Sequence, residues 1–546
     1  MGQILKLAGV VWAAVILFGF GSGLGTWLHR GSRLPAWFWL PIVSAAACLV
    51  SYLLFWVYFL SPEAGRIASW VSWGTSVAAF VWLVRDADTR VLLRQRDAWL
   101  PGLLTALVMA SYLASAFAVP IDINQRFRFP MPADNVLPRM FAERLYDGRY
   151  GLGVPPAPLD VDWRSSDRPP LQAAVIVAAL PLRVGDREYF FQFVETICQM
   201  GWVAALYALA RTMGLTRRYV QFAILAAAGS PFFYFNSLYT WPKLLSTWLF
   251  LTGLAIVLCI VRNRDRVSTT ELPIAAGAIT LGLLAHGGVA FSVLALPLLA
   301  AFWRPWRVMR VSGVAAAIAI ALLLFAPWAA YQRAYDPPGN RLLKLHFGGV
   351  YLIDSRSTTQ TIADAYRALT WRDYLSGRWA NVQQQWFGVY PLPFESVIDW
   401  VQWQQLMRHV PMLGFLAVGY VMLFGTQAGE PFRLTRQLAW YALATMAIWI
   451  VVMILPSSTL IHQGSYVMTS LLVFCAAIFV AMFPPVVRGG LLSLHLLLFA
   501  TCYFFSTRVS PGAPTFWRLR TFVEAALLFA AFVVSLRFLP ADAVRD

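Results

Sequence analysis

The sequence carries little charge. Only 13% of its 546 residues are Asp, Glu, Lys or Arg, whereas soluble domains carry about 25%. This shortage excludes a soluble globular protein of ordinary composition. Long apolar runs replace the missing charge, for example 99–119, 244–260, 311–328 and 466–483, and each approaches the roughly 20 residues that span a bilayer. Only helices satisfy their backbone polar groups in lipid without closing a barrel, so the sequence predicts an all-α polytopic membrane protein.

Paired cysteines and internal repeats are also missing, and the N-terminal segment does not look like a signal peptide. The five cysteines show no CxxC spacing and lie mostly in apolar segments (Cys48, Cys198, Cys259, Cys475 and Cys502), which predicts inert helix residues rather than a disulfide framework or metal ligands. No repeat of about 20 to 50 residues is visible, which excludes a solenoid. Residues 1–28 lack a small-residue cleavage site followed by a soluble domain, and we interpret them as a retained helix.

The net charge of +17 does not indicate a nucleic-acid partner, because the basic residues lie in short loops between the apolar runs. That distribution is typical of topology signals and of contacts to anionic lipid. If these loops all face the cytoplasm, the helices between them pair off consistently, with the N-terminus outside and the C-terminus inside. The loops are 29–33, 85–97, 211–218, 262–266, 303–310, 432–436 and the one around Arg488.

This arrangement predicts about 15 membrane helices: 5–28, 36–60, 67–84, 99–119, 189–211, 219–236, 244–261, 273–285, 289–302, 311–329, 411–427, 437–455, 465–484, 489–506 and 521–539. Two hydrophilic stretches, 120–188 and 330–410, then lie on the outer face. Segment 171–182 is too short to span the bilayer and predicts an interfacial or re-entrant helix. The short helices 273–285 and 289–302 predict a shallow hairpin with His286 at its tip.

The first outer stretch contains a short amphipathic segment, 131–148. Asp134 and Asn135 look like a helix N-cap, Pro138 falls in the first turn, and Gly148 looks like a C-terminal stop. Leu137, Met140, Phe141 and Leu145 would share one apolar face, which predicts a helix lying on the membrane surface with Asp134 at the bilayer edge. An isolated Asp before a helix is more often only a cap.

A second polar segment, DVDWRSSDRPPLQ at 160–172, carries the carboxylates Asp160, Asp162 and Asp167 and the arginines Arg164 and Arg168. Its Pro-Pro step forces an extended entry into the short helix that follows. Arg168 could hold a phosphate through two parallel hydrogen bonds. It could equally extend towards lipid headgroups, which is the commoner role of an interfacial arginine.

Three more polar residues fall on the same predicted face. Lys243 follows a cluster of aromatic residues at the start of a helix, His286 sits at a Gly-rich break, and His462 lies between two helices. Each has an ordinary explanation, as an anchoring Lys or a hydrogen-bonded His. Ionisable residues at membrane depth are functional candidates by default, however. Asp134, Arg168, Lys243, His286 and His462 share one face, which favours a common site.

The order of these segments resembles the GT-C superfamily of integral membrane glycosyltransferases, especially members that use polyprenyl-phosphate sugars, such as aminoarabinose transferases and protein O-mannosyltransferases. The resemblance rests on the Asp-led helix, the RPPL step, and the stretches YALARTMGL, SPFFYFNS, FAPWAAYQ and SYVMTSLL, taken in that order. It covers about 99–484, including both outer stretches. Residues 1–98 would then be additional N-terminal helices, and 485–546 a C-terminal hairpin.

The resemblance implies transfer of a sugar from a lipid-phosphate donor to a glycan, lipid or protein acceptor on the periplasmic face of a bacterial inner membrane. Asp134 matches the family's acidic residue, which acts as base or positions the acceptor. Arg168 matches a donor-phosphate contact, and Lys243 would assist it. Further pocket candidates are Asn135, Asp162, Asp167, His286 and His462. Many relatives have a second acidic residue where Asn135 stands, so a divalent metal is left open and no other cofactor is indicated.

Two other classes fit the helix count. A transporter or flippase of lipid-linked saccharides predicts charged residues in mid-membrane and repeated halves, and Glu195 is the acidic residue set within a predicted helix. A polysaccharide ligase or polymerase of the O-antigen type would take diphosphate-linked glycans. It would depend on basic and His residues of the second outer stretch, which offers Arg333, Arg341, Lys344 and His346.

Overall fold

A computed structural model of the chain describes residues 2–117, 135–159, 163–263, 269–337, 341–350, 355–386, 429–454, 465–481, 483–484, 486–491 and 493. Over these ranges the chain is helical and no strand is present, as predicted. Among the described residues, seven segments are long and apolar enough to cross a membrane: Lys6–Gly31, Ala36–Leu60, Pro62–Val84, Arg187–Thr212, Lys243–Arg262, Val311–Tyr335 and Glu430–Val452. The predicted helix 411–427, helix 521–539 and most of 489–506 lie outside the described residues.

The first half of the chain contains the α-helices α1 (Gly2–Gly31), α2 (Trp39–Leu60), α3 (Pro62–Val84), α4 (Ala87–Arg94), α5 (Arg96–Phe117), α7 (Leu137–Tyr146), α8 (Leu171–Ala179), α9 (Arg187–Met200), α10 (Trp202–Thr212), α11 (Arg217–Ala228), α12 (Pro231–Leu238) and α13 (Lys243–Arg262). The second half contains α14 (Glu271–Ala285), α15 (Ala290–Trp303), α16 (Val311–Ala330), α17 (Arg341–Gly348), α18 (Thr358–Ala368), α19 (Trp371–Trp386), α22 (Glu430–Val452) and α23 (Tyr466–Val480).

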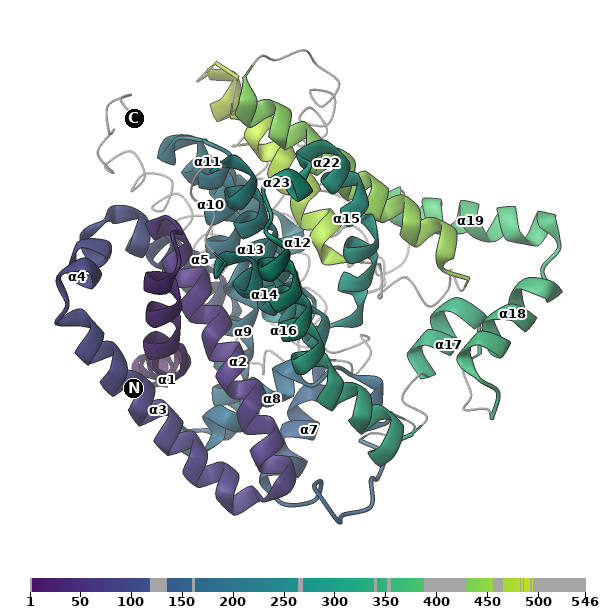
Figure 1. Cartoon of the computed structure of the whole chain (residues 1–546), viewed down its shortest axis with the longest axis horizontal. Coiled ribbons are helices and arrows are strands. Elements are labelled where there is room, and N and C mark those ends of the chain that lie inside the picture. Colours follow the sequence, from purple (N-terminus) through teal and green to yellow (C-terminus); the bar gives the residue numbers. More distant parts are fainter. Residues whose placement is uncertain are drawn as a thin grey trace, which may run out of the picture.

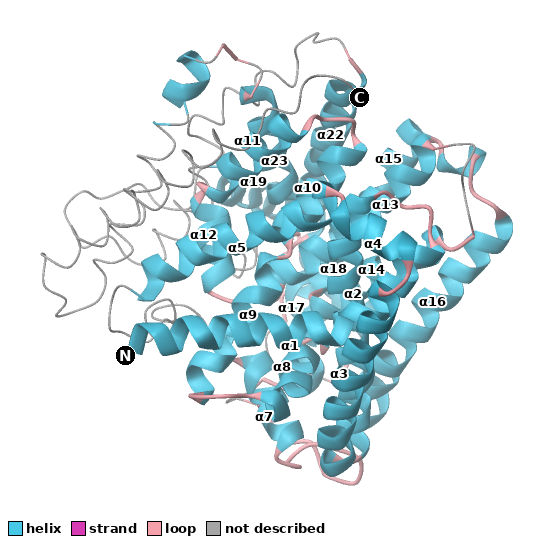
Figure 2. Ribbon diagram, turned by 90° about the vertical axis from the view of Figure 1, so that its left-hand side faces the viewer, coloured by secondary structure: helices cyan, strands magenta, loops and turns pink. Residues whose placement is uncertain are grey.

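Helix α13 is the centre of the bundle. It packs against α9, α10, α14 and α23, and nearly all its residues are buried. Helices α1 to α4 lie on one side of it, while α15, α22 and α23 lie on another, and α17 to α19 project from the bundle (Figure 1). Figure 2 shows the long helices from a second direction. A 20-residue helix is about 30 Å long, so α13 holds Lys243 and Arg262 at opposite ends of the bundle.

The basic loops gather at the Arg262 end. Arg30 pairs with Asp86 at 3.2 Å, the backbone N–H of Arg33 donates to Glu271, and Arg262 pairs with Glu430 at 2.9 Å. The indole N–H of Trp303 donates to Gln437. These contacts join loop 29–33 to loop 85–97, and they join loops 262–266 and 303–310 to residues that flank loop 432–436. The Trp37 indole and Arg262 both contact Thr212, so the two groups of loops lie in one basic layer at one end of the bundle.

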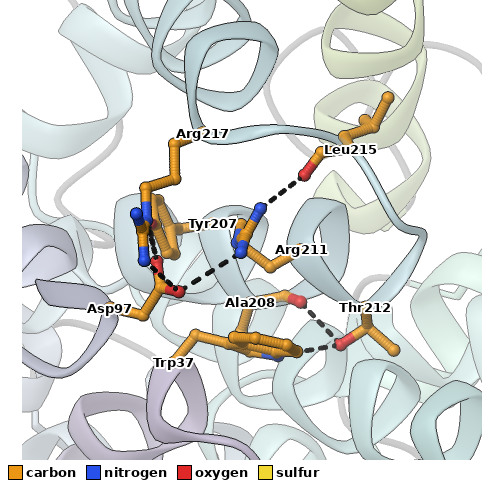
Figure 3. A network of polar contacts seen from close by, with 8 residues as sticks. All are labelled: Trp37, Asp97, Tyr207, Ala208, Arg211, Thr212, Leu215 and Arg217. Atoms are coloured by element: carbon orange, nitrogen blue, oxygen red, sulfur yellow. Dashed lines mark hydrogen bonds and ion pairs between the residues drawn. The ribbon is translucent and has the colours of Figure 1, made fainter. Parts of the chain in front are cut away.

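One buried carboxylate organises part of this layer. Asp97 accepts hydrogen bonds from the Tyr207 hydroxyl at 2.5 Å, from Arg217 Nε at 3.0 Å and from Arg211 at 3.3 Å. The three donors come from the end of α10 and the start of α11, while Asp97 lies in the first turn of α5 (Figure 3). Beside them the Trp37 indole N–H donates to Thr212. A single anion therefore fixes three helices to one another.

Two predicted helices are interrupted, although the first still forms one apolar span from Arg187 to Thr212. Segment 189–211 divides into α9 and α10 at Gly201, where a Cβ would lie 2.5 Å from the indole of Trp248. The Trp248 indole N–H approaches closely enough to donate to the Cys198 carbonyl at 2.8 Å, so the glycine and the indole define the break together. Segment 219–236 divides into α11 and α12 because Pro231 opens a new helix.

The predicted shallow hairpin 273–285 and 289–302 is also wrong. Helix α14 packs on α13 and α16, whereas α15 packs on α22, so the two helices separate after His286 (Figure 1). Each runs between the two ends of the bundle. Glu271 at the start of α14 accepts from Arg33 in the basic layer, while Ser292 at the start of α15 hydrogen-bonds Ser465 at the other end.

The two short outer helices are buried in protein. In α7 the residues Leu137, Phe141 and Leu145 are almost fully buried, and the Phe141 ring packs against Phe55 of α2. The apolar face predicted to rest on the membrane therefore contacts the bundle. Every residue of α8 is buried, so this helix is enclosed by protein and does not face lipid.

Replacing Gly201 with Ala should lower the unfolding temperature in detergent, because the new methyl group meets the Trp248 ring and either the ring or α13 must move. Gly74 provides the matched control, since a Cβ there meets no atom within 4 Å. We expect Gly74→Ala to leave the unfolding temperature unchanged or raise it, because Ala is the better helix former. Equal effects of the two substitutions would contradict the proposed close contact.

Replacing Asp97 with Asn should destabilise the protein by about 1.5–3 kcal/mol, the usual contribution of hydrogen bonds to a charged group, because Arg211 and Arg217 lose their shared anion. Asp88→Asn is the control, since Asp88 is exposed. Thermal unfolding followed by tryptophan fluorescence measures both. An Asp97→Asn protein as stable as the control would show that the network contributes little.

Candidate functional site

The first component of the candidate site is the turn before α8. Ser165–Asp167 form a 3-10 turn in which the Asp167 carboxylate accepts the backbone N–H of Arg164 at 2.9 Å. The backbone is extended at Arg168, because a proline disfavours the helical conformation in the residue before it. Arg168 is only 6% exposed, and its guanidinium lies over the Trp163 indole at 4.5 Å. The turn thus holds a buried cation at the start of a buried helix.

A second arginine reaches the same indole from the other outer stretch. Arg341 in α17 lies over Trp163 at 5.2 Å and pairs with Asp167 at 3.6 Å. Both partners are almost fully buried. Arg341 therefore ties the second outer stretch to the first, and the Asp167 carboxylate serves this pair. Burial raises the pKa of Asp167, while Arg341 and Arg168 act against that rise.

A further ion pair reinforces the same junction. The buried Asp336 carboxylate accepts the Ser165 hydroxyl at 2.7 Å and the Ser166 backbone N–H at 3.2 Å, and Arg164 pairs with it at 3.3 Å. The Ser165 hydroxyl also hydrogen-bonds the Tyr331 hydroxyl, in the π-helical turn Tyr331–Tyr335 that continues α16. The 160–172 segment is thus fixed to the end of a membrane helix.

Lys243 is the second buried cation. It begins α13, is 2% exposed, and places its ammonium 4.2 Å from the Trp241 ring centre and 4.7 Å from that of Tyr466. Cation–π contacts of this kind replace part of the hydration that a buried ammonium loses. The turn before it is strained, because Thr240 adopts a positive φ of 60°, which is unusual for a β-branched residue.

A buried polar network supports this turn. The Thr240 hydroxyl donates to Glu195 of α9 at 3.2 Å, and its carbonyl accepts the Gln172 amide at 2.8 Å. Gln199 donates to Gln172 and accepts the Leu245 backbone N–H. Backbone strain that persists in a folded protein needs such external support. Glu195, the carboxylate that a transporter would use, has here the role of holding the turn before Lys243.

Two histidines complete the cluster. His286, between α14 and α15, accepts the Gly288 N–H on Nδ1 at 2.9 Å, which leaves Nε2 to carry the proton of the neutral ring. Its ring lies 6.1 Å from Trp241. His346 of α17 is the second histidine. Burial, and then the positive charges of Arg168 and Lys243, lower the pKa of His346 to about 4. Burial, then Lys243, Arg168 and His346, also lower the pKa of His286.

The structure therefore gathers Arg168, Lys243 and His286, three of the five residues expected to share a site, and Asp167 adjoins them. Asp134, Asp162 and His462 lie outside the described residues. The proposed cap is wrong for Asn135, since Val136 is the N-cap of α7 and no side chain caps it. Asn135 is instead buried, and its amide has no hydrogen-bond partner among the described residues. Pro138 and Gly148 lie where predicted, in the first turn and after the last.

Several residues that complete the cluster were not predicted to belong to it, although Arg341 and His346 were candidates for the polysaccharide ligase alternative. Trp163, Arg341 and His346 belong to outer stretches with no strong motif, and Asp336 follows the end of α16. The available signal was composition, since basic and His residues are concentrated at 333–346. Within the described ranges, no three His, Cys, Asp or Glu side chains gather as metal ligands do. The described cysteines Cys48, Cys198, Cys259 and Cys475 are free and buried, as predicted.

Searches for similar proteins identify no relative. No protein-family model matches the chain, and neither a curated protein nor a solved structure matches it. The geometry of the cluster therefore carries the functional argument. We call Arg168, Lys243, His286 and His346 the cationic cluster. Its two charged members are Arg168 and Lys243, and both act on the rings of His286 and His346, an arrangement that favours a bound anion.

The His346 environment predicts a dependence of stability on pH. The unfolded chain binds the His346 proton at an ordinary pKa near 6.5, whereas the folded chain binds it only near 4. The folded state therefore loses stability as pH falls from about 6.5 to about 4. Comparing unfolding temperatures over this range, His346→Gln should show a shallower decline than the wild type. Arg149→Gln, a change at an exposed salt bridge, should keep the wild-type slope, and a wild-type slope in His346→Gln as well would contradict the assignment.

Proposed function

We propose that this protein is a membrane glycosyltransferase that moves a sugar from a polyprenyl-phosphate donor to an acceptor. The observation that carries the proposal is the cationic cluster at one end of a membrane bundle, where Arg168 and Lys243 are buried against Trp163, Trp241 and Tyr466. A lipid phosphate matches it chemically, since the phosphate is anionic and its chain is apolar. Arginine also suits phosphate because its fork of donors matches two phosphate oxygens.

In the proposed reaction an acceptor hydroxyl attacks the anomeric carbon of the donor sugar. A new carbon–oxygen bond forms as the bond between the anomeric carbon and the phosphate oxygen breaks, and the electron pair leaves with the phosphate. Arg168 and Lys243 stabilise the charge that gathers on this leaving group. Asp134, three residues before α7 in the sequence, orients the acceptor hydroxyl and takes its proton. His286 and His346 line the phosphate side of the site.

The proposal also includes the architecture of the protein. We propose about 15 membrane helices, a GT-C-like core over 99–484, and a site on the periplasmic face of a bacterial inner membrane. Two observations support this orientation. The cationic cluster and the basic layer lie at opposite ends of α13, and basic loops favour the cytoplasmic side. The cluster is then on the outer face, where lipid-phosphate donors are used by the family that the sequence resembles.

A second candidate is a polysaccharide ligase or polymerase that uses a diphosphate-linked donor. The placement of α17 favours it, because His346 faces Arg168 and Lys243 while Arg341 pairs with Asp167. The second outer stretch thus places a histidine and an arginine beside the cluster, and basic and His residues of this stretch are what the second candidate would use. A transporter gains less support, since the buried Glu195 is hydrogen-bonded to the turn before Lys243.

Donor consumption by the purified protein tests these alternatives. Reconstituted in nanodiscs with polyprenyl-phosphate sugars and, separately, with diphosphate-linked saccharides, the protein should release free polyprenyl phosphate from the former. Arg168→Ala and Lys243→Ala should each lower the rate by about 10²- to 10³-fold, as the loss of one stabilising donor does elsewhere. Arg149→Ala, at an exposed salt bridge, should keep wild-type activity.

Direct binding of polyprenyl phosphate provides a readout that does not require the correct sugar. Native mass spectrometry should detect the bound lipid on the wild type and on Asp134→Asn, but less on Arg168→Ala, because Asp134 acts on the acceptor. Asp134→Asn should nevertheless lose transfer. Full transfer by both Asp134→Asn and Arg168→Ala would refute the proposed roles, and turnover restricted to diphosphate donors would establish the second candidate.

A further inference from the structure

A cavity of about 520 Å³ lies at the end of the bundle opposite the cationic cluster. The end of α13, the end of α15 and the start of α22 enclose it. Its charged lining consists of Arg262, Arg304, Arg307, Arg433 and Glu430. Four guanidinium groups thus face one carboxylate in a concave site. Such a lining favours an anionic ligand.

The single carboxylate is already engaged. Glu430 pairs with Arg262 at 2.9 Å and with Arg433 at 3.8 Å, and Arg262 also donates to the Thr212 carbonyl. Arg304 and Arg307 make no ion pair with any other described residue. The two arginines on the α15 side therefore contribute uncompensated positive charge. The part of the cavity beside them is where an anion would bind most favourably.

The backbone after α15 places these two arginines together. Arg304 ends the helix in the left-handed conformation, with φ 52° and ψ 52°, which residues other than glycine rarely adopt. Pro305–Arg307 then form one 3-10 turn. The helix end and the 3-10 turn bring Arg304 and Arg307 to the same cavity, and both residues line it.

The surroundings indicate a lipid rather than a soluble anion. Trp306 is 61% exposed and Phe302 is 43% exposed, and Phe302 lines the cavity together with Val261 and Leu258. Tryptophan beside arginine at the end of membrane helices is typical of the bilayer interface. A ligand here meets guanidinium groups at its head and apolar side chains beside it, which is the pattern of a phospholipid.

We propose that this cavity binds the phosphate headgroup of an anionic phospholipid in the leaflet opposite the cationic cluster. Arg304, Arg307 and Arg433 would contact the phosphate, and Phe302 and Val261 would contact the start of the acyl chains. The bound lipid would join α15 to α22 and α13, since all three line the site. Lipid binding at this site does not depend on sugar transfer, so its test is separate from the test of the proposed function.

The test compares lipid binding by the whole purified protein and two double variants. Arg304→Gln with Arg307→Gln removes the uncompensated pair, and Arg90→Gln with Arg94→Gln is the matched control. Arg90 and Arg94 are exposed in α4, so the control loses equal charge outside the cavity. Native mass spectrometry and thermal unfolding in detergent are measured with phosphatidylglycerol, with phosphatidylcholine and with inorganic phosphate.

Wild type and control should bind phosphatidylglycerol in preference to phosphatidylcholine and gain thermal stability from it. The cavity variant should bind phosphatidylglycerol about tenfold or more weaker, since each basic residue near an anionic surface contributes substantially, and it should lose the gain. Arg307→Lys keeps the charge and should retain most of the phosphatidylglycerol binding. This result would show that the double variant loses binding because it loses charge in the cavity and not because it is misfolded. An unchanged preference in the cavity variant, or equal stabilisation by inorganic phosphate, would overturn the proposal.

Discussion

The structure depends on the burial of α13 along nearly its whole length. A helix that is apolar on all sides is stable only when other helices cover it, and α9, α10, α14 and α23 do so here. Because the helix is fixed inside the bundle, its two charged ends are fixed as well. Lys243 is held among Trp241 and Tyr466 at one end, and Arg262 joins the basic layer at the other. The chemical difference between the two ends follows from this one helix.

The cationic cluster is costly to maintain, and its neighbours show how the protein offsets that cost. Buried charges need partners, because the desolvation of an unpaired charge costs several kcal/mol and the folded state has only a small margin of stability. Arg168 and Lys243 lie against aromatic rings, Arg341 pairs with Asp167, and burial among cations lowers the pKa of His346. An anionic ligand would relieve the remaining repulsion. Under the proposed function, this arrangement would be a preformed site for negative charge, as electrostatic catalysis of phosphate departure requires.

The site is assembled from parts that are distant in the chain. The turn before α8, the turn before α13, the link after α14 and helix α17 each contribute, and the network of Thr240, Glu195, Gln172 and Gln199 stiffens the second of these. Ion pairs of Asp167 and Asp336 connect the two outer stretches, so α17 is held beside the cluster. A change in any one element would displace a charge that the others are arranged to face.

The sequence by itself determined the helical class, the common end of the basic loops and the identity of Arg168, Lys243 and His286 as candidates. Hydrophobic runs and loop charge can be read from short segments. The bilayer makes the first decide which segments form membrane helices and the second decide which loops lie on the same side. Breaks at Gly201 and Pro231, the divergence of α14 from α15 and the burial of α7 and α8 required tertiary structure, because each depends on which neighbour is present. Trp163, Arg341 and His346 joined the cluster for the same reason. Their sequence context is unremarkable, and only packing decides which distant cation lies over which ring.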